Sequence, residues 1–269
     1  MLINNKYEII QLIGKGGFSK VYLAKHNITN EYVAIKMEKL KTSTPLLKSE
    51  AEIYMCLQKR KIDISPNFKG YGIYKSHTYM VLEFLDTSLA SIIKDKKMIS
   101  FNIVCNLGYQ MITLLKTFHE QGILHRDIKP ANFLFSKDKT LKLIDFGLSK
   151  IYIRDNLHIP YKEDYKMIGT SKYASLKVHK GIEYSRRDDI ESMIYTLIEV
   201  YKGFLPWTYC ICKNKTDTYK IMEMIKDKCN MERFCGPEAI ILVELLDYIR
   251  TVEFDEEPNY EWIKTKLNV

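Results

Sequence analysis

A short stretch, His125–Asn132 with the sequence HRDIKPAN, brings three chemically useful side chains close together in the chain. Asp127 can accept a proton from a hydroxyl group, Lys129 can stabilise a phosphoryl group in transfer, and Asn132 can bind a metal ion. A second stretch, Asp145–Gly147 (DFG), follows, and a carboxylate next to a flexible glycine suits Mg²⁺. By itself DFG is also an ordinary turn sequence.

A glycine-rich stretch, Gly14–Ser19 (GKGGFS), lies near the N-terminus between two segments with the pattern of β-strands. Glycine lets the backbone approach a phosphate closely and present its N–H groups to it. The stretch differs from the dinucleotide-binding pattern GxGxxG, because Ser19 stands at the third glycine and no βαβ pattern surrounds it. It also lacks the GK[ST] ending of a P-loop. Taken alone, the stretch is equally typical of a hairpin turn.

The segment Val33–Lys36 (VAIK) ends an apolar strand pattern with a lysine. Lys36 is either a solubilising residue at the end of a strand or a cation that faces a phosphate. Two carboxylates on the helix expected at Leu46–Arg60, Glu50 and Glu52, compete as its partner. Residues two positions apart lie on different faces of a helix, and the spacing from Lys36 favours Glu50.

The secondary-structure pattern changes after about residue 85. Strands are expected at Tyr7–Ile13, Lys20–His26, Glu31–Glu38, Asn67–Lys75 and Thr78–Phe84, with the one helix between them. Helices are expected at Phe101–Gln121, Asp188–Tyr201, Thr216–Lys228, Pro237–Arg250 and Tyr260–Leu267, with short strand-like pieces around residues 131–145. This order predicts an α+β fold of two lobes, residues 1–85 and 86–269, with a ligand bound between them.

The longest expected helix, Phe101–Gln121, has apolar residues at every third or fourth position. The apolar positions are Ile103, Val104, Leu107, Met111, Leu114, Leu115 and Phe118. Ser100 is placed to cap its N-terminus, and Gly122 is placed to end it. We therefore expect one face of this helix to be buried.

The composition is that of a globular protein. Of 269 residues, 46% are hydrophobic, which is enough for a sizeable core and excludes a disordered or collagen-like chain. No segment approaches the ~18 uncharged apolar residues of a membrane span. The N-terminus lacks the basic start and apolar run of a secretory signal. We expect a protein of the cytoplasm, the nucleus or both.

Lysine and arginine outnumber aspartate and glutamate by 41 to 33, which gives a net charge of +8. This excess favours acidic partners such as phosphate, acidic peptides, nucleic acid or anionic lipid, without choosing among them. Four of the six cysteines, Cys210, Cys212, Cys229 and Cys235, cluster in the sequence and raise the question of zinc. Their first pair is spaced CxC rather than the usual Cx₂₋₄C, so we expect reduced thiols.

The glycine-rich stretch, VAIK, HRDIKPAN and DFG occur together in the order and at spacings found in protein kinases. From these motifs the whole chain resembles a eukaryotic protein kinase. Three further stretches resemble the casein kinase 1 family in particular: GTSKYAS at 169–175, HKGIEYSRRDDIES at 179–192 and GFLPW at 203–207. The usual APE sequence is absent, and GTSKYAS stands in its place.

The resemblance implies a Ser/Thr kinase with ATP and Mg²⁺ as cofactors. It implies that Asp127 orients the substrate hydroxyl and accepts its proton, that Lys129 binds the γ-phosphate, and that Asn132 and Asp145 bind Mg²⁺. The residues that it places around ATP are Ile13, Gly14, Gly16, Gly17, Val21, Ala34, Lys36, Glu50, Leu82 as gatekeeper, Glu83 and Leu85 of the hinge, and Asp145. Asp189 is expected to hold the catalytic-loop backbone.

The resemblance also implies protein substrates that carry acidic or phosphorylated residues upstream of the target. Lys172 matches a basic position of the family's anion site, and Arg186 and Arg187 could add to that site or brace the segment. The family's second anion-binding lysine aligns near Thr218, and Lys213, Lys215 and Lys220 are possible substitutes for it. Strong phosphate priming is therefore in question, whereas an acidic preference is expected.

The chain ends directly after its last expected helix, without the C-terminal tail of many casein kinases, and we expect a constitutively active monomer. Thr170, Ser171 and Tyr173 are candidates for phosphorylation. The alternative is a pseudokinase that binds ATP as a scaffold, although none of Lys36, Asp127, Asn132 or Asp145 is substituted. Nucleic-acid binding would rest on net charge alone, so no nucleic-acid partner is expected.

Overall fold

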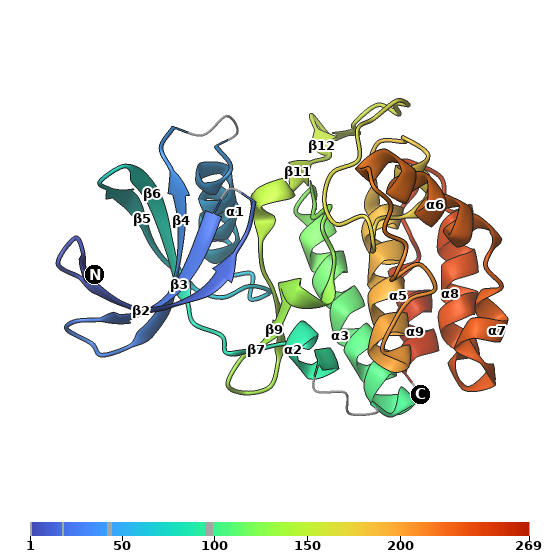
Figure 1. Ribbon diagram of the computed structural model, residues 1–269, viewed down its shortest axis with the longest axis horizontal. Helices are drawn as coiled ribbons and strands as arrows, with labels where there is room; N and C mark the ends of the chain where they lie inside the picture. The colour runs from blue at the N-terminus through green and yellow to red at the C-terminus, as the bar shows by residue number, and fades with distance from the viewer. Residues whose placement is uncertain (1, 18, 42–44, 95–98, 269) are drawn as a thin grey trace. The chain divides into compact units, whose positions relative to one another are not determined.

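The computed structural model describes residues 2–17, 19–41, 45–94 and 99–268 (Figure 1). The described chain forms two compact units. The first comprises residues up to Ser88 together with Leu134–Gly147, and the second comprises Leu89–Phe133 and Leu148 onward. Each unit is described by itself below. Phe18 of the glycine-rich stretch lies outside the described residues.

The first unit contains a six-stranded antiparallel sheet in the order β1-β2-β3-β4-β6-β5. Its strands are β1 (Leu2–Ile3), β2 (Tyr7–Lys15), β3 (Ser19–His26), β4 (Tyr32–Lys39), β5 (Phe68–Tyr74) and β6 (His77–Glu83). The five strands expected from the sequence are confirmed to within two residues, whereas β1 is too short to have been detected by its pattern.

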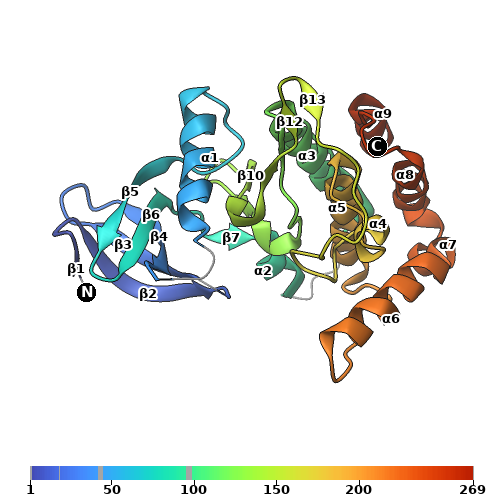
Figure 2. The ribbon, with the colours of Figure 1, turned by 90° about the horizontal axis from the view of Figure 1, so that it is seen from above.

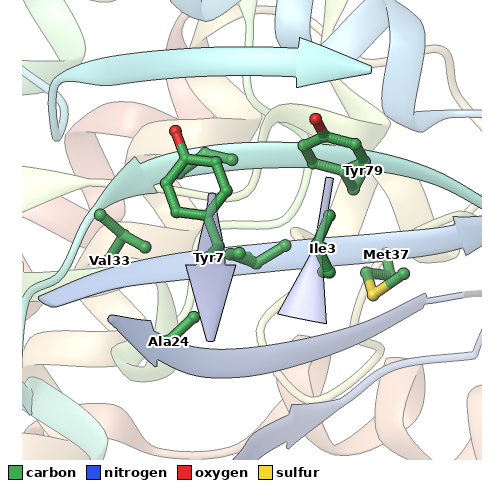
Figure 3. Close-up of a cluster of buried hydrophobic side chains, with 8 residues drawn as sticks. Ile3, Tyr7, Ala24, Val33, Met37 and Tyr79 are labelled. Carbon is green, nitrogen blue, oxygen red and sulfur yellow. The ribbon is translucent and has the colours of Figure 1, made fainter. Parts of the chain in front are cut away.

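One face of this sheet carries a hydrophobic core. Figure 3 shows Ile3, Tyr7, Ala24, Val33, Met37 and Tyr79 gathered on that face, and Ile35 and Val81 belong to the same buried cluster. Side chains alternate between the two faces of a strand. The intervening residues of β4, Ala34 and Lys36, therefore project from the opposite face, where the site of the first unit is built.

Helix α1 (Leu47–Lys59) packs against β4, β5 and β6, as Figure 2 shows. Its buried residues are Leu47, Glu50, Ala51, Tyr54 and Leu57. Four of these are apolar or aromatic and hold the helix against the sheet by hydrophobic burial. The fifth is a carboxylate, Glu50, which requires a charged partner at that depth.

A small three-stranded sheet in the order β10-β9-β7 completes the strand content around the first unit. Its strands are β7 (Thr87–Ser88), β9 (Phe133–Phe135) and β10 (Leu141–Leu143). The latter two are the strand-like pieces expected around residues 131–145. Strand β10 ends two residues before Asp145, so a sheet fixes the backbone just before the DFG stretch.

The second unit is mainly helical. Its helices are α2 (Leu89–Lys94), α3 (Phe101–Glu120), α4 (Leu176–His179), α5 (Arg186–Lys202), α6 (Lys215–Lys228), α7 (Met231–Cys235), α8 (Ile240–Thr251) and α9 (Tyr260–Leu267). Short 3₁₀ turns form at Pro130–Asn132, Phe146–Leu148 and Pro237–Ala239, and two short β-ribbons pair β8 (Ile123–Leu124) with β11 (Lys150–Ile151) and β12 (Ile153–Arg154) with β13 (Leu157–His158).

Helix α5 is the central element of this unit. It packs between α3 and α8, and α3 also contacts α9 (Figures 1 and 2). Nearly every residue of α5 is buried, which explains why its sequence shows no single apolar stripe. The backbone N–H of Ser185 donates to the carboxylate of Asp188 (2.7 Å) and starts the helix, and Gly203 ends it with φ +80°.

The five helices expected in the second unit are present. Gly122 ends α3 with φ +74°, as expected, and Ser100 occupies the N-cap position of α3 without a side-chain hydrogen bond to the helix. Ile103 is 54% exposed, so it does not belong to the buried stripe of α3. Helices α2, α4 and α7 were not expected, because each is too short to show periodicity. Within the described residues, no helix is both long and apolar enough to cross a membrane.

Candidate active site

The register of the first sheet places several of the residues predicted to surround ATP next to one another. Val21 lies opposite both Gly14 and Lys36, and Ala34 lies opposite Leu82. Directly paired residues of neighbouring strands point to the same face. Gly14, Val21, Ala34, Lys36 and Leu82 therefore share the face opposite to the hydrophobic core. Bulges in β2 between Ile9 and Gln11 and between Leu12 and Gly14 shift this register.

Lys36, on that face, is paired with two carboxylates. Its ammonium group lies 2.6 Å from a carboxylate oxygen of Glu50 and 2.6 Å from one of Asp145. Burial alone would lower its pKa, but the two carboxylates together hold the pKa of Lys36 above its ordinary value. The helix spacing had favoured Glu50 over Glu52, and this is confirmed, because Glu52 is exposed on another face of α1.

The backbone of Asp145 is unusual. Its φ is +68°, a left-handed conformation that costs energy for any residue except glycine. Its N–H donates to the hydroxyl of Tyr54 at 3.1 Å, and the ring of Tyr54 packs against Phe146 with 4.5 Å between the ring centroids. Helix α1 thus fixes Asp145 in two ways: Tyr54 accepts from its backbone N–H, and Glu50 binds Lys36, which also contacts the Asp145 carboxylate.

The glycine-rich turn and the hinge lie at two ends of the sheet. The N–H of Gly16 donates to the carbonyl of Ser19 at 2.8 Å and closes the turn, and a Cβ at Gly17 would meet nothing within 4 Å. At the other end, Glu83 accepts from the side-chain amide of Asn67 (2.8 Å). Of the remaining predicted residues, Leu82 and Leu85 are buried and Ile13 is exposed.

The HRDIKPAN stretch builds a compact cluster in the second unit. The carboxylate of Asp127 lies 2.5 Å from the ammonium group of Lys129, and the amide nitrogen of Asn132 donates to the carbonyl of Asp127 (2.8 Å). This last bond leaves the amide oxygen of Asn132 as its group for a metal ion. All three side chains predicted to be catalytic are therefore brought together and oriented.

Sequence reasoning missed the role of Gly169 and Thr170. The hydroxyl of Thr170 donates to Asp127 (2.7 Å) and lies 3.2 Å from the ammonium group of Lys129. Gly169 has φ +80°, and a Cβ there would come within 2.5 Å of the carbonyl oxygen of Arg126. Only glycine allows this approach. Threonine was considered only as a phosphorylation site, and no local pattern indicates a contact with a residue 43 positions away.

Asp189 holds the backbone of the catalytic loop, as expected. Its carboxylate accepts from the N–H groups of His125 (2.7 Å) and Arg126 (2.8 Å) and from the ring of His119 (3.0 Å). Burial favours the neutral acid, but these hydrogen bonds and the neighbouring histidines keep the pKa of Asp189 below its ordinary value. A buried carboxylate at the start of α5 thus supports a backbone in which Arg126 has φ +66°.

The structure does not bring together the three cations proposed for an anion site. Lys172 pairs with Glu199, near the C-terminal end of α5, whereas Arg186 and Arg187 open the same helix. Arg187 is 5% exposed and donates to the carbonyl of Val252, and Arg186 donates to the carbonyl of Asp255. These contacts favour the second of the two alternatives for the arginines, that they brace the segment after α8, and the anion site stays a prediction that rests on Lys172.

The two residues predicted to bind Mg²⁺ lie in different units. Asp145 belongs to the first unit and Asn132 to the second, and each offers a hard oxygen ligand of the kind that Mg²⁺ takes together with substrate phosphates. The six cysteines are free thiols. In the described ranges, no three His, Cys, Asp or Glu side chains gather into a metal-binding group.

The family model for the protein kinase domain matches residues 7–248 of this chain. The chain therefore belongs to the protein kinase family. This match confirms the α+β, two-lobed kinase fold expected from the sequence, with its strand-rich N-terminal part and helical C-terminal part. It identifies the protein as a kinase and a transferase in general terms.

Proposed function

We propose that this protein is a Ser/Thr protein kinase of the casein kinase 1 type, which transfers the γ-phosphate of ATP to protein hydroxyl groups. The cluster of Asp127, Lys129 and Thr170 carries this proposal. Asp127 has one carboxylate oxygen bound to Thr170 and the other to Lys129. A substrate hydroxyl that took the place of the Thr170 hydroxyl would meet the same carboxylate in position to accept its proton.

Residues of the two units have different roles in the proposed reaction. ATP with Mg²⁺ supplies the phosphoryl group and neutralises its charge. In the first unit, Lys36 is a charged donor already oriented by Glu50, which suits a phosphate oxygen. In the second unit, Asp127 orients the hydroxyl, and Lys129 places a cation beside it. Phosphoryl transfer depends mainly on such positioning and charge stabilisation.

Activity without phosphorylation of the activation segment is part of the proposal. The guanidinium group of Arg126 donates to the carbonyl of Leu148 (2.7 Å) and to the hydroxyl of Tyr165 (3.2 Å). It also lies over the ring of Tyr184. Groups of the unmodified chain thus already hold the arginine next to Asp127, and no phosphate is needed to order it.

The substrates proposed are proteins with acidic or phosphorylated residues upstream of the target. The resemblance to casein kinase 1 and the net charge of +8 support this preference, with Lys172 as its reader. We further propose a monomer of the cytoplasm or nucleus. The competing proposal of an ATP-binding pseudokinase has no support from the site, because each of its charged groups is present and partnered.

The test is transfer of labelled phosphate from Mg-ATP to peptides that differ only in serine, threonine or tyrosine at the target position. We expect transfer to serine and threonine. Asp127→Asn should reduce it about 10³-fold, because the hydroxyl loses its proton acceptor. Asp247→Asn, on an exposed part of α8, is the matched control and should match the unaltered protein. Nucleotide binding without transfer to any peptide would favour the pseudokinase.

A further inference from the structure

Lys172, the proposed reader of substrate charge, is held by a carboxylate of the chain itself. Its ammonium group lies 2.5 Å from one carboxylate oxygen of Glu199, and the hydroxyl of Tyr173 donates to the other oxygen at 2.5 Å. The side chain of Lys172 is 23% exposed and that of Glu199 only 8%. The pair is therefore more accessible to a ligand at the lysine than at the glutamate.

The backbone around Lys172 is fixed independently of this pair. Its carbonyl accepts from the indole N–H of Trp207 (2.6 Å), and the carbonyls of Ser171 and Ala174 accept from the ammonium group of Lys226 (3.0 and 2.5 Å). Glu199 is likewise fixed, because it lies in the buried helix α5. Since both backbones are held, Lys172 and Glu199 stay within reach of each other.

Glu199 also faces the space beside the catalytic cluster. Together with Tyr173 it lines a cavity of about 180 Å³, and Lys129 and Pro130 of the catalytic loop line the same cavity. Lys129 is the residue that contacts Asp127. A peptide whose target hydroxyl lies at Asp127 would pass its neighbouring residues close to this cavity, and hence close to Glu199.

We propose that Glu199 is a specificity-determining residue that competes with the substrate for Lys172 and weakens the preference for acidic and phosphorylated peptides. The proposal rests on the proposed function, in which Lys172 reads substrate charge. An incoming anion must displace a carboxylate that is tethered beside the lysine and therefore present at a high effective concentration. After displacement, the negative charge of Glu199 remains nearby and repels the anion.

The experiment measures binding rather than transfer. Three labelled peptides carry phosphoserine, aspartate or alanine three residues before the target serine, and their Kd values are measured by fluorescence anisotropy. In the unaltered protein, we expect the aspartate peptide to bind modestly more tightly than the alanine peptide. Glu199→Gln should raise the ratio of their Kd values about tenfold, which corresponds to ~1.4 kcal/mol, or one charge-assisted hydrogen bond to Lys172. The phosphoserine peptide should gain at least as much.

Two further variants test whether the effect of Glu199→Gln depends on Lys172. Lys172→Met should abolish the preference, and Lys172→Met combined with Glu199→Gln should behave like Lys172→Met alone. Glu238→Gln is the matched control, because Glu238 also accepts from a tyrosine hydroxyl, that of Tyr201 (2.6 Å), and its loss changes the net charge equally. It should leave the ratio unchanged.

The outcomes separate this proposal from the proposed function. An unchanged ratio in Glu199→Gln, or an equal rise in Glu238→Gln, would overturn the role of Glu199 even if the protein transfers phosphate. Conversely, the expected Kd ratios without any phosphate transfer would support the specificity role of Glu199 and overturn the proposed kinase activity. If binding is too weak for anisotropy, the ratio of kcat/KM values on the same peptides replaces it. A protein with neither binding nor transfer overturns both.

Discussion

Two lysines withdrawn from solvent, Lys36 in the first unit and Lys226 in the second, meet different surroundings. Lys36 has two carboxylates at 2.6 Å. Lys226, which is completely buried, has the carbonyls of Ser171 and Ala174 and the faces of Tyr195 and Trp207, with about 5 Å from its ammonium group to each ring centroid. Both nitrogens are satisfied, but only the first is neutralised by charge.

The two surroundings move the pKa values in opposite directions. Carboxylates raise the pKa of Lys36 despite its burial, whereas burial holds the pKa of Lys226 well below its ordinary value. A lysine that stays charged suits a phosphate, and a lysine bound to carbonyl groups suits a structural brace. The comparison teaches that burial alone does not identify a functional lysine: the chemistry of its partners does.

The largest expected effect is on catalysis at Lys36. Lys36→Met should reduce phosphate transfer about 10³-fold, because the cation proposed to bind the phosphates is lost. The free energy of unfolding should fall by only ~1–3 kcal/mol, since Glu50 can take up a proton when its partner is gone. Transfer assays and denaturant unfolding check the two values. Lys39→Met, an exposed change in the same strand, should alter neither, and transfer retained in Lys36→Met would contradict the comparison.

The next effect is on stability at Lys226. Lys226→Met should lower the free energy of unfolding by ~2–4 kcal/mol, because the buried carbonyls of Ser171 and Ala174 lose their donor. Phosphate transfer by the folded protein should fall far less than in Lys36→Met. Urea unfolding measures the difference, and Lys228→Met, exposed in the same helix, should stay within about 0.5 kcal/mol of the unaltered protein. Equal stability of Lys226→Met and Lys228→Met would contradict the bracing role of Lys226.

The smallest effect at neutral pH concerns His179, whose Nε2 lies 3.1 Å from the ammonium group of Lys226 and near the ring of Tyr219. Burial and the neighbouring lysine lower the pKa of His179 to about 3. Between pH ~6.5 and about 3, the unfolded chain therefore binds a proton at this residue that the folded protein does not, and stability falls as the pH falls. His179→Gln should remove up to ~1.4 kcal/mol per pH unit of this slope. If the free energy of unfolding varies with pH in the same way in the unaltered protein and in His179→Gln, His179 does not contribute to this slope.

Much of the first unit could be predicted from the sequence, because strand patterns and motif spacing are local. The pairing of Lys36 with Glu50 rather than Glu52 followed from helix periodicity alone. In the second unit, the grouping of Asp127, Lys129 and Asn132 also followed from one short stretch, which the structure folds into a single cluster. Sequence reasoning succeeds where the partners lie in one motif or one turn of helix.

The second unit was harder to predict, because its important contacts join distant segments. Glu199 pairs with Lys172 across 27 positions, and Lys226 reaches Ser171 across 55. Neither Glu199 nor Lys226 lies in a recognisable motif. Arg186 and Arg187 show the same limit: the sequence left open whether they join an anion site or brace the segment, and in the structure they donate to the carbonyls of Asp255 and Val252. The sequence alone does not reveal whether a charged side chain already has a partner within the folded protein.

The segment from Gly169 to Ala174 has an implication for how such an enzyme can diverge. Thr170 contacts the catalytic carboxylate, and Lys172 and Tyr173 contact Glu199. Ser171 and Ala174 are tied to Lys226. Because neighbouring residues contact groups proposed for catalysis, for substrate choice and for stability in turn, we expect hardly any exchange in this segment to affect one property alone. New specificities should therefore arise more readily through partners such as Glu199 than through the segment itself.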